Sequence, residues 1–479
     1  MRQITINGEI FHVNDGTILS DFLMKSEKKV EHLCGGRGTC KKCKVIVNGK
    51  EELSCQYVVS SDITVETIDK ENIISETGTE DSDNLTEHMC MVLDIGTTTL
   101  ALGLVSLDTH QIVRTITATN AQRTFGADVM SRIDYCQKNG VHALHSSIVS
   151  CVNQMIVDLK ITDTVEKLYV AGNATMLHLF LGVDCSTMGT APYTPVFLDS
   201  KRLGAGEIGI CRIKEIITLP SIASFVGADL VAGLNYVSMP KKDAYSLLID
   251  LGTNAEIVLF SRQDILCTAA AAGPCFEGAG ISCGMSATKG AIYSYSFPEE
   301  IHTIEDAPAK GICGTGIIDV IAELVQHDVI DETGYMEENF AITEEISLNQ
   351  NDVREYQLAK SAVCSAIQTL MQIRNISFGD VENVYISGGF SSKINLDNAT
   401  KTGLLPKEVA DKCIAINNSS FLGTIKYACE QNELSNYLEH VQYIDLSSNL
   451  IFTERFIENM MFSVPTQINS RPLGNLVRV

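Results

Sequence analysis

The sequence lacks long hydrophobic runs and any excess of positive charge. No stretch approaches the roughly 20 apolar residues that a membrane-spanning helix requires, and the segment MRQITINGEIFHV at the N-terminus has no continuous apolar core of the kind found in secretory signals. The formal net charge is −23 at pH 7, so the phosphates of nucleic acids and of anionic membranes would be repelled. These absences predict a cytoplasmic protein that binds neither nucleic acid nor membrane.

Cysteine, by contrast, is abundant, with 16 residues. A chain of 479 residues can bury the cores of two or more domains, and such cores need no disulfides for their stability. The cysteines are therefore expected to be reduced thiols, some of which bind metal.

Four cysteines near the N-terminus have the spacing C-x5-C-x2-C-x11-C; they are Cys34, Cys40, Cys43 and Cys55. The glycine-rich loop 35–38 leaves backbone N–H groups available to hydrogen-bond the sulfides of a cluster. A zinc ribbon usually has two C-x2-C pairs, whereas this segment has one pair and a glycine loop. The spacing therefore favours a [2Fe–2S] cluster, with structural zinc as the alternative.

The surroundings of these cysteines indicate a small β-rich domain. Apolar and polar residues alternate on both sides of Asn7-Gly8, and a second Asn-Gly pair stands at Asn48-Gly49; such pairs favour tight hairpin turns. A short helical pattern covers residues 18–24. We predict a β-grasp, ferredoxin-like domain over residues 1–65.

An acidic segment follows this domain. Residues 66–88 contain eight acidic residues and a single lysine, separated by Ser, Thr, Asn and Gly. Such a composition is self-repelling and predicts an extended linker. The linker is either a mobile tether for the cluster or a plain spacer between domains.

The next stretch, Met91-Val-Leu-Asp94-Ile-Gly-Thr-Thr-Thr99, has the pattern of a buried strand that ends in a tight turn. Glycine lets backbone N–H groups approach an anion, the threonines add donors, and Asp94 can hold a hydrated Mg²⁺. The same pattern returns about 156 positions later, at Asp250-Leu-Gly-Thr-Asn254. This internal duplication predicts two phosphate-binding turns facing one cleft. The phosphate contacts are expected from Gly96, Thr97, Thr98, Thr99, Gly252, Thr253 and Asn254.

Two further glycine turns complete the pattern. A predicted strand over 384–387 ends in Gly388-Gly389, which could pack against a purine and ribose. Gly314 lies in a glycine-rich crossing before a predicted hinge helix over 317–325. Strands and helices alternate after an initial meander, so residues 89–479 are predicted to form one α/β domain with lobes over roughly 89–245 and 246–479.

In order and spacing these motifs resemble the two phosphate motifs, the connecting helix and the adenosine motif of the actin, Hsp70 and sugar-kinase superfamily, whose two-lobed ATPase domain is a duplicated ribonuclease-H-like fold. The phrases FGADVMSRI, NATMLHLFLG, FVGADLVAG and AAAGPCFEGAGISCGMSA, together with the ferredoxin-like head, extend the resemblance over nearly the whole chain. The chain is similar to the reductive activators of corrinoid proteins.

The resemblance implies an ATP-dependent activity. Members of this family are expected to transfer one electron from the iron–sulfur cluster to inactive Co(II) corrinoid on a methyltransferase partner, which restores Co(I). It also implies ATP and Mg²⁺ as cofactors, an upstream low-potential electron donor, and a homodimer. The short linker predicts that this chain lacks the separate middle domain of longer relatives. No cluster of cysteines follows Cys413, so the electron carrier is expected at the N-terminus alone.

Three carboxylates are candidates for catalysis: Asp94, Asp250 and Asp229. Asp128 and Asp229 each follow Gly-Ala and could position the attacking water, although a helix N-cap is the preferred interpretation for both. Cys275, in the loop 271–280, faces a partner or lies in an ordinary turn. Met176 and His178 are expected in the core or on the surface rather than as ligands.

Three other activities fit parts of the sequence. A small-molecule kinase regulated by the redox state of its cluster is the main alternative. An activator of a radical dehydratase fits less well, since such proteins are implied to hold one [4Fe–4S] cluster between subunits and to lack a ferredoxin head. An electron-transfer scaffold with an inert nucleotide pocket is the third alternative.

Overall fold

The computed structural model describes residues 1–25, 38, 43–67, 75–77, 88–161, 163–242, 244–389, 393–431, 434 and 438–462. The chain forms two compact units, which are described separately below. The first unit comprises Met1–Ala269, Tyr385–Gly389 and Ala415–Ile444, and the second comprises Ala270–Val384, Phe390–Ile414 and Asp445–Val479. Within the described parts of the chain, no helix is long and apolar enough to span a membrane.

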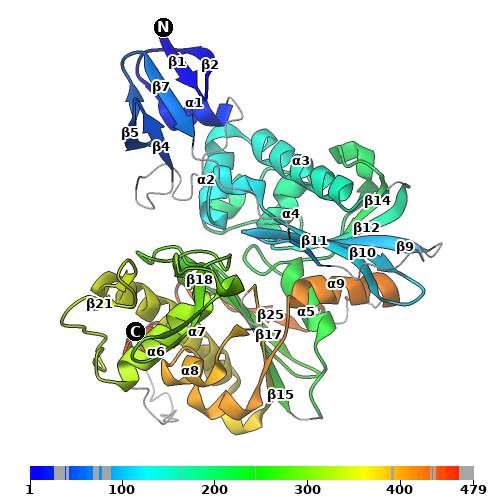
Figure 1. Cartoon of the computed structure of the whole chain (residues 1–479). Coiled ribbons are helices and arrows are strands. Elements are labelled where there is room, and N and C mark those ends of the chain that lie inside the picture. Colours follow the sequence, from blue (N-terminus) through cyan, green and yellow to red (C-terminus); the bar gives the residue numbers. More distant parts are fainter. Residues whose placement is uncertain are drawn as a thin grey trace, which may run out of the picture. The chain divides into compact units, whose positions relative to one another are not determined.

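The N-terminal sheet confirms the predicted β-grasp. Its five strands have the order β2-β1-β7-β4-β5, with β1 antiparallel to β2 and parallel to β7 (Figure 1). Both predicted Asn-Gly turns connect hairpins, with Asn7 and Asn48 at positive φ. The elements are β1 (Arg2–Ile6), β2 (Glu9–Val13), β3 (Thr17–Ile18), α1 (Leu19–Lys25), β4 (Lys44–Val47), β5 (Lys50–Leu53), β6 (Val58–Val59) and β7 (Ile63–Thr67). Side chains that alternate along these strands and α1, among them Ile4, Leu23 and Val65, form a separate core.

Part of the acidic segment pairs with a sheet, whereas the sequence predicted an unpaired linker. Strand β8 (Ser75–Thr77) pairs antiparallel with β11 (Ile112–Thr119), so that Thr77 faces Thr115. The exposed backbone edge of β11 offers hydrogen-bonding groups, and a short segment with a β-branched residue can pair with it despite its charge. The rest of the predicted linker between Thr67 and His88 lies outside the described residues.

The first large sheet has the order β13-β14-β12-β9-β10-β11-β8. Strands β9, β10 and β11 form the predicted antiparallel meander, and β12 runs parallel to β9. The elements are β9 (Met89–Ile95), β10 (Thr99–Ser106), β11, η1 (Ala121–Thr124), α2 (Val129–Asn139), α3 (His142–Asp158), β12 (Val165–Gly172), α4 (Ala174–Phe180), β13 (Arg202–Gly204) and β14 (Ile213–Thr218). Helices α2, α3 and α4 bury their apolar sides against this sheet in one cluster.

A second sheet repeats this topology. Its order is β24-β23-β15-β16-β17-β25, so β15, β16 and β17 occupy the places of β9, β10 and β11, and β23 takes the place of β12. The elements are β15 (Tyr245–Leu251), β16 (Ala255–Phe260), β17 (Ile265–Ala270), β23 (Val381–Ser387), β24 (Cys413–Ala415) and β25 (Val441–Tyr443). The duplication that the two Asp-x-Gly-Thr motifs predicted is therefore present in the strand order.

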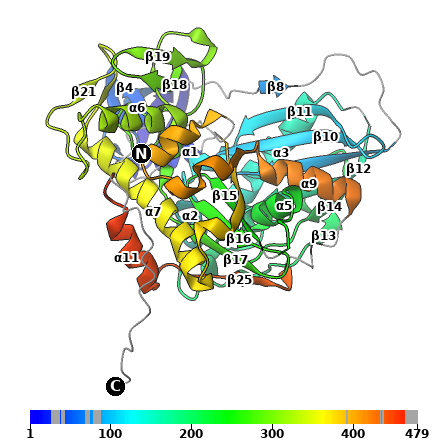
Figure 2. The same ribbon diagram turned by 90° about the horizontal axis from the view of Figure 1, so that it is seen from below.

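Helices α5 (Ala228–Tyr236) and α9 (Ser419–Glu430) lie side by side in the first unit (Figure 2). Small residues allow this close approach: a Cβ at Gly423 would lie 1.8 Å from the carbonyl oxygen of Ala232, and one at Gly233 would lie 2.8 Å from the hydroxyl oxygen of Ser419. The packing brings the N-terminus of α9 to β9.

The second unit is built mainly from helices and short strands. Its elements include η4 (Pro274–Glu277), β18 (Ala291–Ser296), β19 (Glu300–Thr303), β20 (Gly311–Ile312), α6 (Gly314–Gln326), β21 (Phe340–Ala341), β22 (Ser347–Leu348), α7 (Gln350–Arg374), α8 (Leu396–Lys401) and α11 (Leu450–Glu458). The predicted helix over 317–325 is α6, which begins at Gly314. The buried ammonium of Lys360 on α7 donates to the carbonyls of Asn459 and Met461 and thereby holds the end of α11.

Candidate functional site

Two of the four predicted cluster ligands lie together. Cys43 precedes β4 and Cys55 follows β5, and the β4–β5 hairpin brings their sulfur atoms to 3.2 Å. Both side chains are buried, and the amide Nε2 of Gln56 lies 3.6 Å from the sulfur of Cys55. Cys34 and Cys40 lie outside the described residues. Two convergent thiols beside a backbone turn fit a thiolate-bound metal cluster.

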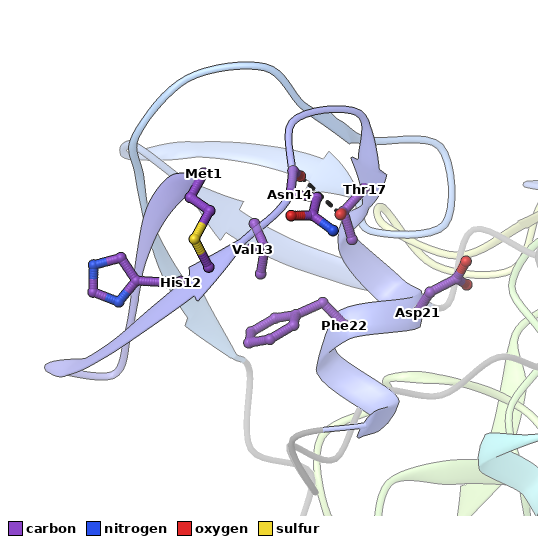
Figure 3. A pocket seen from close by; sticks show the side chains of 7 residues that line it. All are labelled: Met1, His12, Val13, Asn14, Thr17, Asp21 and Phe22. Carbon is purple, nitrogen blue, oxygen red and sulfur yellow. Dashed lines mark hydrogen bonds between the residues drawn. The ribbon is translucent and has the colours of Figure 1, made fainter.

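A surface hollow of about 250 Å³ lies elsewhere in the same domain (Figure 3). It is lined by Met1, His12, Val13, Asn14, Thr17, Asp21 and Phe22. None of these residues is a cysteine or a predicted nucleotide contact, so the hollow is separate from the sites that the sequence predicted.

The first predicted phosphate turn is the connection between β9 and β10. The N–H of Gly96 donates to the carbonyl oxygen of Thr99 at 3.0 Å, and a Cβ at Gly96 would lie 2.5 Å from that oxygen. Only glycine therefore fits this turn without a shift of the backbone.

The second predicted turn is its counterpart between β15 and β16. The N–H of Gly252 donates to the carbonyl oxygen of Asn254 at 3.0 Å. Gly388, at the end of β23, has a φ of +117°, and a Cβ there would lie 2.2 Å from the carbonyl oxygen of Leu251. The structure thus places Gly388 beside the second turn, as expected for motifs that share a site.

The three candidate carboxylates, Asp94, Asp229 and Asp250, influence one another. Asp94 is buried near the end of β9, whereas Asp229 and Asp250 keep some accessible surface. Burial, followed by the charge of Asp94, raises the pKa of Asp250 to about 7. Burial and then the charge of Asp250 raise the pKa of Asp229. Such a group of carboxyls near one another favours a bound cation or shared protons at neutral pH.

The N-cap interpretation is right for Asp128 and wrong for Asp229. The carboxylate of Asp128 accepts from the N–H of Ser131 at 2.7 Å, and Ser131 completes a capping box at the start of α2. In α5 the N-cap is Gly227, which leaves Asp229 inside the first turn. A Cβ at Gly227 would lie 2.3 Å from the Cα of Asn173, so the close crossing of two chain segments sets where α5 begins.

Two residues that the sequence did not point to hold Asp94 in place. The amide of Asn418 donates to one oxygen of the Asp94 carboxylate at 2.5 Å, and the hydroxyl of Ser420 donates to the other at 2.7 Å. Asn418 is also the N-cap of α9, because its side-chain oxygen accepts from the N–H of Phe421 at 2.9 Å. The N-cap pattern Asn-Ser-Ser before an apolar helix is visible in the sequence, but its contact with Asp94 is not.

A second set of hydroxyls connects the start of α9 with the other acid. The hydroxyls of Ser387 and Ser419 lie 2.8 Å apart, and the hydroxyl of Ser387 is 3.5 Å from a carboxylate oxygen of Asp250. Burial raises the pKa of Asp94, whereas the hydrogen bonds from Asn418 and Ser420 lower it. The start of α9 therefore contacts Asp94 directly, and Asp250 through Ser387.

Metal binding by these acids is not visible in the geometry of the protein alone. Among the residues that the structure describes, no group of three or more His, Cys, Asp or Glu side chains is arranged to hold a metal ion. Asp94 could still hold a cation through water, because its oxygens accept hydrogen bonds only from neutral donors in the contacts above.

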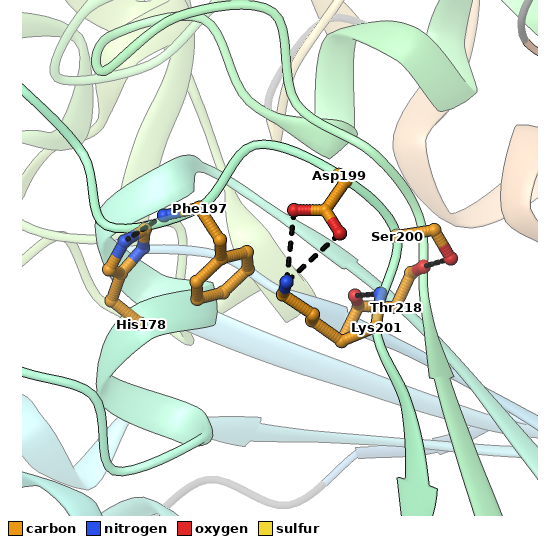
Figure 4. A network of polar contacts seen from close by, with 6 residues as sticks. All are labelled: His178, Phe197, Asp199, Ser200, Lys201 and Thr218. Carbon is orange, nitrogen blue, oxygen red and sulfur yellow. Dashed lines mark hydrogen bonds and ion pairs between the residues drawn. The ribbon is translucent and has the colours of Figure 1, made fainter.

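The remaining predictions concern packing. His178 is buried, and its ring stacks on that of Phe197 with the centroids 4.2 Å apart (Figure 4). Its Nδ1 donates to the carbonyl of Ala174, and its Nε2 accepts from the N–H of Val196. This arrangement requires a neutral ring, so the core interpretation of His178 is confirmed. Met176 is likewise buried.

Two other predicted residues, Cys275 and Gly314, lie in the second unit. Cys275 is buried in η4, within the loop 271–280. A Cβ at Gly314 would lie 1.9 Å from the carbonyl oxygen of Phe276, and the contact between α6 and η4 accounts for that glycine by itself.

Family models match almost the entire chain. The 2Fe-2S iron-sulfur cluster binding domain matches residues 4–70, the RACo middle region matches 89–242, and the C-terminal domain of RACo, the ASKHA domain, matches 244–471. The prediction that the middle region is absent was therefore wrong. That region is the first lobe of what we predicted as the ATPase domain, so the short linker says nothing about its presence.

Two characterised relatives have similar sequences. The corrinoid activation enzyme RamQ of Eubacterium limosum is 27% identical, over 95% of this chain and 98% of the relative. The [Co(II) methylated amine-specific corrinoid protein] reductase of Methanosarcina barkeri is 27% identical, over 77% of this chain and 75% of the relative.

A solved structure described as a reductive activator for corrinoid, iron-sulfur protein has the same fold. Its TM-score is 0.71 at 24% identity, over 96% of this chain and 98% of that one. The ferredoxin-type head precedes the ASKHA domain, as the sequence motifs predicted, and the RACo middle region lies between them. The chain belongs to the family of reductive activators of corrinoid proteins.

Proposed function

We propose that this chain reduces the Co(II) corrinoid of a methyltransferase corrinoid protein to Co(I), one electron at a time, and that ATP drives the transfer. The observation that carries the proposal is the presence, in one chain, of a ferredoxin fold with converging Cys43 and Cys55 and of a duplicated sheet whose two Asp-x-Gly turns frame interacting carboxylates. The ferredoxin fold can carry an electron, and the duplicated sheet with its two turns suits a nucleoside triphosphate.

The electron carrier is assigned to Cys34, Cys40, Cys43 and Cys55. When bound there, a [2Fe–2S] cluster supplies single electrons, with a potential near about −400 mV in plant-type ferredoxins. Burial of Cys43 and Cys55 keeps water from their thiolates, and Gln56 offers an amide donor to Cys55. Both features adjust the reduction potential of a cluster.

The nucleotide is assigned to the two turns. The backbone and hydroxyl groups of Gly96–Thr99 and Gly252–Asn254 bind the phosphates, and Gly388 and Gly389 pack against adenosine. Asp94 would hold a hydrated Mg²⁺ ion through its water ligands. Asp229 and Asp250, whose pKa values are raised, are the groups that would accept a proton from the attacking water.

Coupling is assigned to the start of α9. Asn418 and Ser420 contact Asp94, so a cation held near Asp94 would alter the hydrogen bonds of this helix end. If the corrinoid partner binds the two resulting states with different affinity, ATP hydrolysis shifts the electron transfer. A tenfold difference in affinity is equivalent to about 59 mV for one electron.

An anaerobic assay tests the function. The protein, a low-potential reductant and a Co(II) corrinoid protein are mixed, and Co(I) is followed by its absorbance with and without ATP and Mg²⁺. We expect Co(I) only with ATP, and its loss in Asp94→Ala and in Cys43→Ser. Reduction that is independent of ATP would overturn the proposal. ATP-dependent phosphorylation of a small molecule that persists in Cys43→Ser would favour the redox-regulated kinase instead.

We also propose an electron donor, a cellular location and an oligomeric state for this protein. An upstream low-potential donor reduces the cluster, and the protein acts as a cytoplasmic homodimer. All cysteines among the described residues are free thiols, which suits a reducing compartment. Light scattering of the purified protein measures the mass of the assembly, and a monomeric mass would remove the dimer from the proposal.

A further inference from the structure

The first turn is held from behind by side chains that sequence analysis did not assign. The amide Nδ2 of Asn120 donates to the carbonyl oxygen of Gly96 at 2.8 Å, and the backbone N–H of Asn120 donates to that of Thr98 at 2.8 Å. The guanidinium of Arg132 donates to the carbonyl oxygen of Thr97 at 2.5 Å. All three carbonyls of the turn are therefore fixed by donors outside the β9–β10 hairpin.

This arrangement determines where the turn's N–H groups point. In a planar trans peptide the carbonyl oxygen and the following N–H lie on opposite sides. When the carbonyls of Gly96 and Thr97 are drawn toward Asn120 and Arg132, the N–H groups of Thr97 and Thr98 point away from these residues. Backbone N–H groups that point outward from a glycine turn form a concave site for anions.

Arg132 adds a permanent charge behind the turn. Its side chain is completely buried on α2, and arginine stays protonated in proteins. Besides Thr97, the guanidinium donates to the carbonyl of Gly126 at 2.9 Å and to the side-chain oxygen of Gln122 at 3.3 Å. These bonds fix the planar group in one orientation, so its charge lies next to the turn and favours an anion there.

Asn173 supports the turn from a third element. Its amide Nδ2 donates to the hydroxyl oxygen of Thr97 at 3.2 Å, while its oxygen caps α4 by accepting from the N–H of Met176 at 2.9 Å. Asn120 has the same double role, because its oxygen accepts from the N–H of Gln122 at 3.0 Å in η1. In both asparagines one end stabilises a helix start and the other reaches the turn.

We propose that Arg132, Asn120 and Asn173 are positioning residues for the first phosphate turn. Through this turn they determine the preference of the site for a nucleoside triphosphate over the nucleoside alone. Arg132 orients the Thr97 carbonyl and supplies positive charge, and the two asparagines fix the flanking groups. The inference rests on the proposed nucleotide site.

The test compares affinities for Mg²⁺-ATP and for adenosine by titration calorimetry. Serine is as good an N-cap as asparagine, so Asn120→Ser and Asn173→Ser keep the helix caps and lose only the amide donor. Asn449→Ser is the matched control, because Asn449 caps α11 by accepting from the N–H of Phe452. Arg132→Lys keeps the positive charge but loses the planar set of N–H donors, and Arg132→Met removes both the charge and the donors.

We expect ATP affinity to fall about 3- to 10-fold in each serine variant and about 10- to 100-fold in Arg132→Met, the ranges for neutral and charged hydrogen bonds. Arg132→Lys should lie between wild type and Arg132→Met. Adenosine affinity should stay within twofold in all variants, and Asn449→Ser should match wild type for both ligands.

Two results would overturn the inference. One is unchanged ATP affinity in Asn120→Ser and Asn173→Ser, and the other is an equal loss for ATP and adenosine, which a purely structural role would produce. If the Arg132 variants fail to fold, the two serine variants decide. A wild-type protein with no preference for ATP over adenosine would instead contradict the proposed nucleotide site.

Discussion

The two Asp-x-Gly-Thr turns come from the same motif and the same place in a repeated sheet, yet their acids have different surroundings. Asp94 is buried and accepts strong hydrogen bonds from Asn418 and Ser420. Asp250 is partly accessible, and its bond from Ser387 is long, at 3.5 Å. The difference indicates separate roles: Asp94 is a fixed acceptor, and Asp250 exchanges protons near neutral pH.

The largest expected effect comes from removing the fixed carboxylate. Asp94→Asn should lower the ATP hydrolysis rate by about 100- to 1,000-fold, the range for loss of one preorganised electrostatic contact. In addition, the amide group of the new asparagine would face the amide donor of Asn418. Steady-state hydrolysis at saturating Mg²⁺-ATP measures the effect. Asp128→Asn is the control, because it keeps the cap of α2. A hydrolysis rate of Asp94→Asn within twofold of the wild-type rate would contradict the special role of Asp94 relative to Asp250.

The contrast between the turns could be predicted from the sequence only in part. The repeated pattern located both turns and their strands, because strand periodicity and Asp-x-Gly turns are local features. The partner of Asp94 could not be found this way, since Asn418 lies 324 positions away along the chain. Only the packing of α5 against α9, made possible by Gly423 and Gly233, brings the two together.

Local rules also failed where the chain crosses itself closely. Gly-Ala-Asp occurs at both Asp128 and Asp229, and the pattern predicted an N-cap at each. The N-cap of α5 is Gly227, two residues before Asp229, so Asp229 lies in the first turn of the helix, where the charges of Asp250 and Asp94 act on it. The same applies to β8, where pairing with β11 outweighed the charge of the acidic segment.

A smaller effect is expected from loosening Asp94 without removing it. Asn418→Ser keeps a cap for α9 but loses the amide donor, so the pKa of Asp94 should rise above its present, already raised value. If hydrolysis needs the ionised carboxylate, the acid limb of its pH profile moves to higher pH. We expect a shift of about one pH unit, since one unit is about 1.4 kcal/mol and a charged hydrogen bond contributes about that much.

Asn449→Ser serves as the matched cap variant for this profile, because Asn449 caps α11 in the second unit. A profile of Asn418→Ser that coincides with that of Asn449→Ser would show that Asn418 does not influence the charge of Asp94. The two turns would then differ in burial alone.

The second turn can be probed through stability. The pKa of Asp250 is about 7 in the folded protein, above its usual value, so the unfolded state loses this proton first as pH rises. The cost to the folded state begins above about pH 4 and is complete above about pH 7. Asp250→Asn removes this cost, which is at most about 4 kcal/mol for a pKa that rises from 3.8 to about 7, so Tm at pH 8 without nucleotide should rise by several °C.

The comparison variant is Asp94→Asn, measured in the same way. It also removes a buried charge, but it disrupts the hydrogen bonds with Asn418 and Ser420, so its Tm should rise less than that of Asp250→Asn or should fall. Equal gains in the two variants would show that those bonds contribute little to the stability of Asp94.

The smallest expected effect concerns His178 on helix α4, which follows Asn173 in the chain. Burial lowers the pKa of His178 on α4, the helix that Asn173 caps. The unfolded state therefore binds the proton more tightly, so stability is complete above about pH 6.5 and declines as pH falls below it. His178→Gln keeps an acceptor for Val196 and a donor for Ala174, and should flatten this decline by about 1 to 2 °C in Tm between pH 7 and pH 5.5. His145→Gln is the control, because His145 also contacts α4, through the carbonyl of Phe180. If Tm of His178→Gln falls between pH 7 and pH 5.5 as much as Tm of the wild type does, groups other than His178 cause the loss of stability in acid.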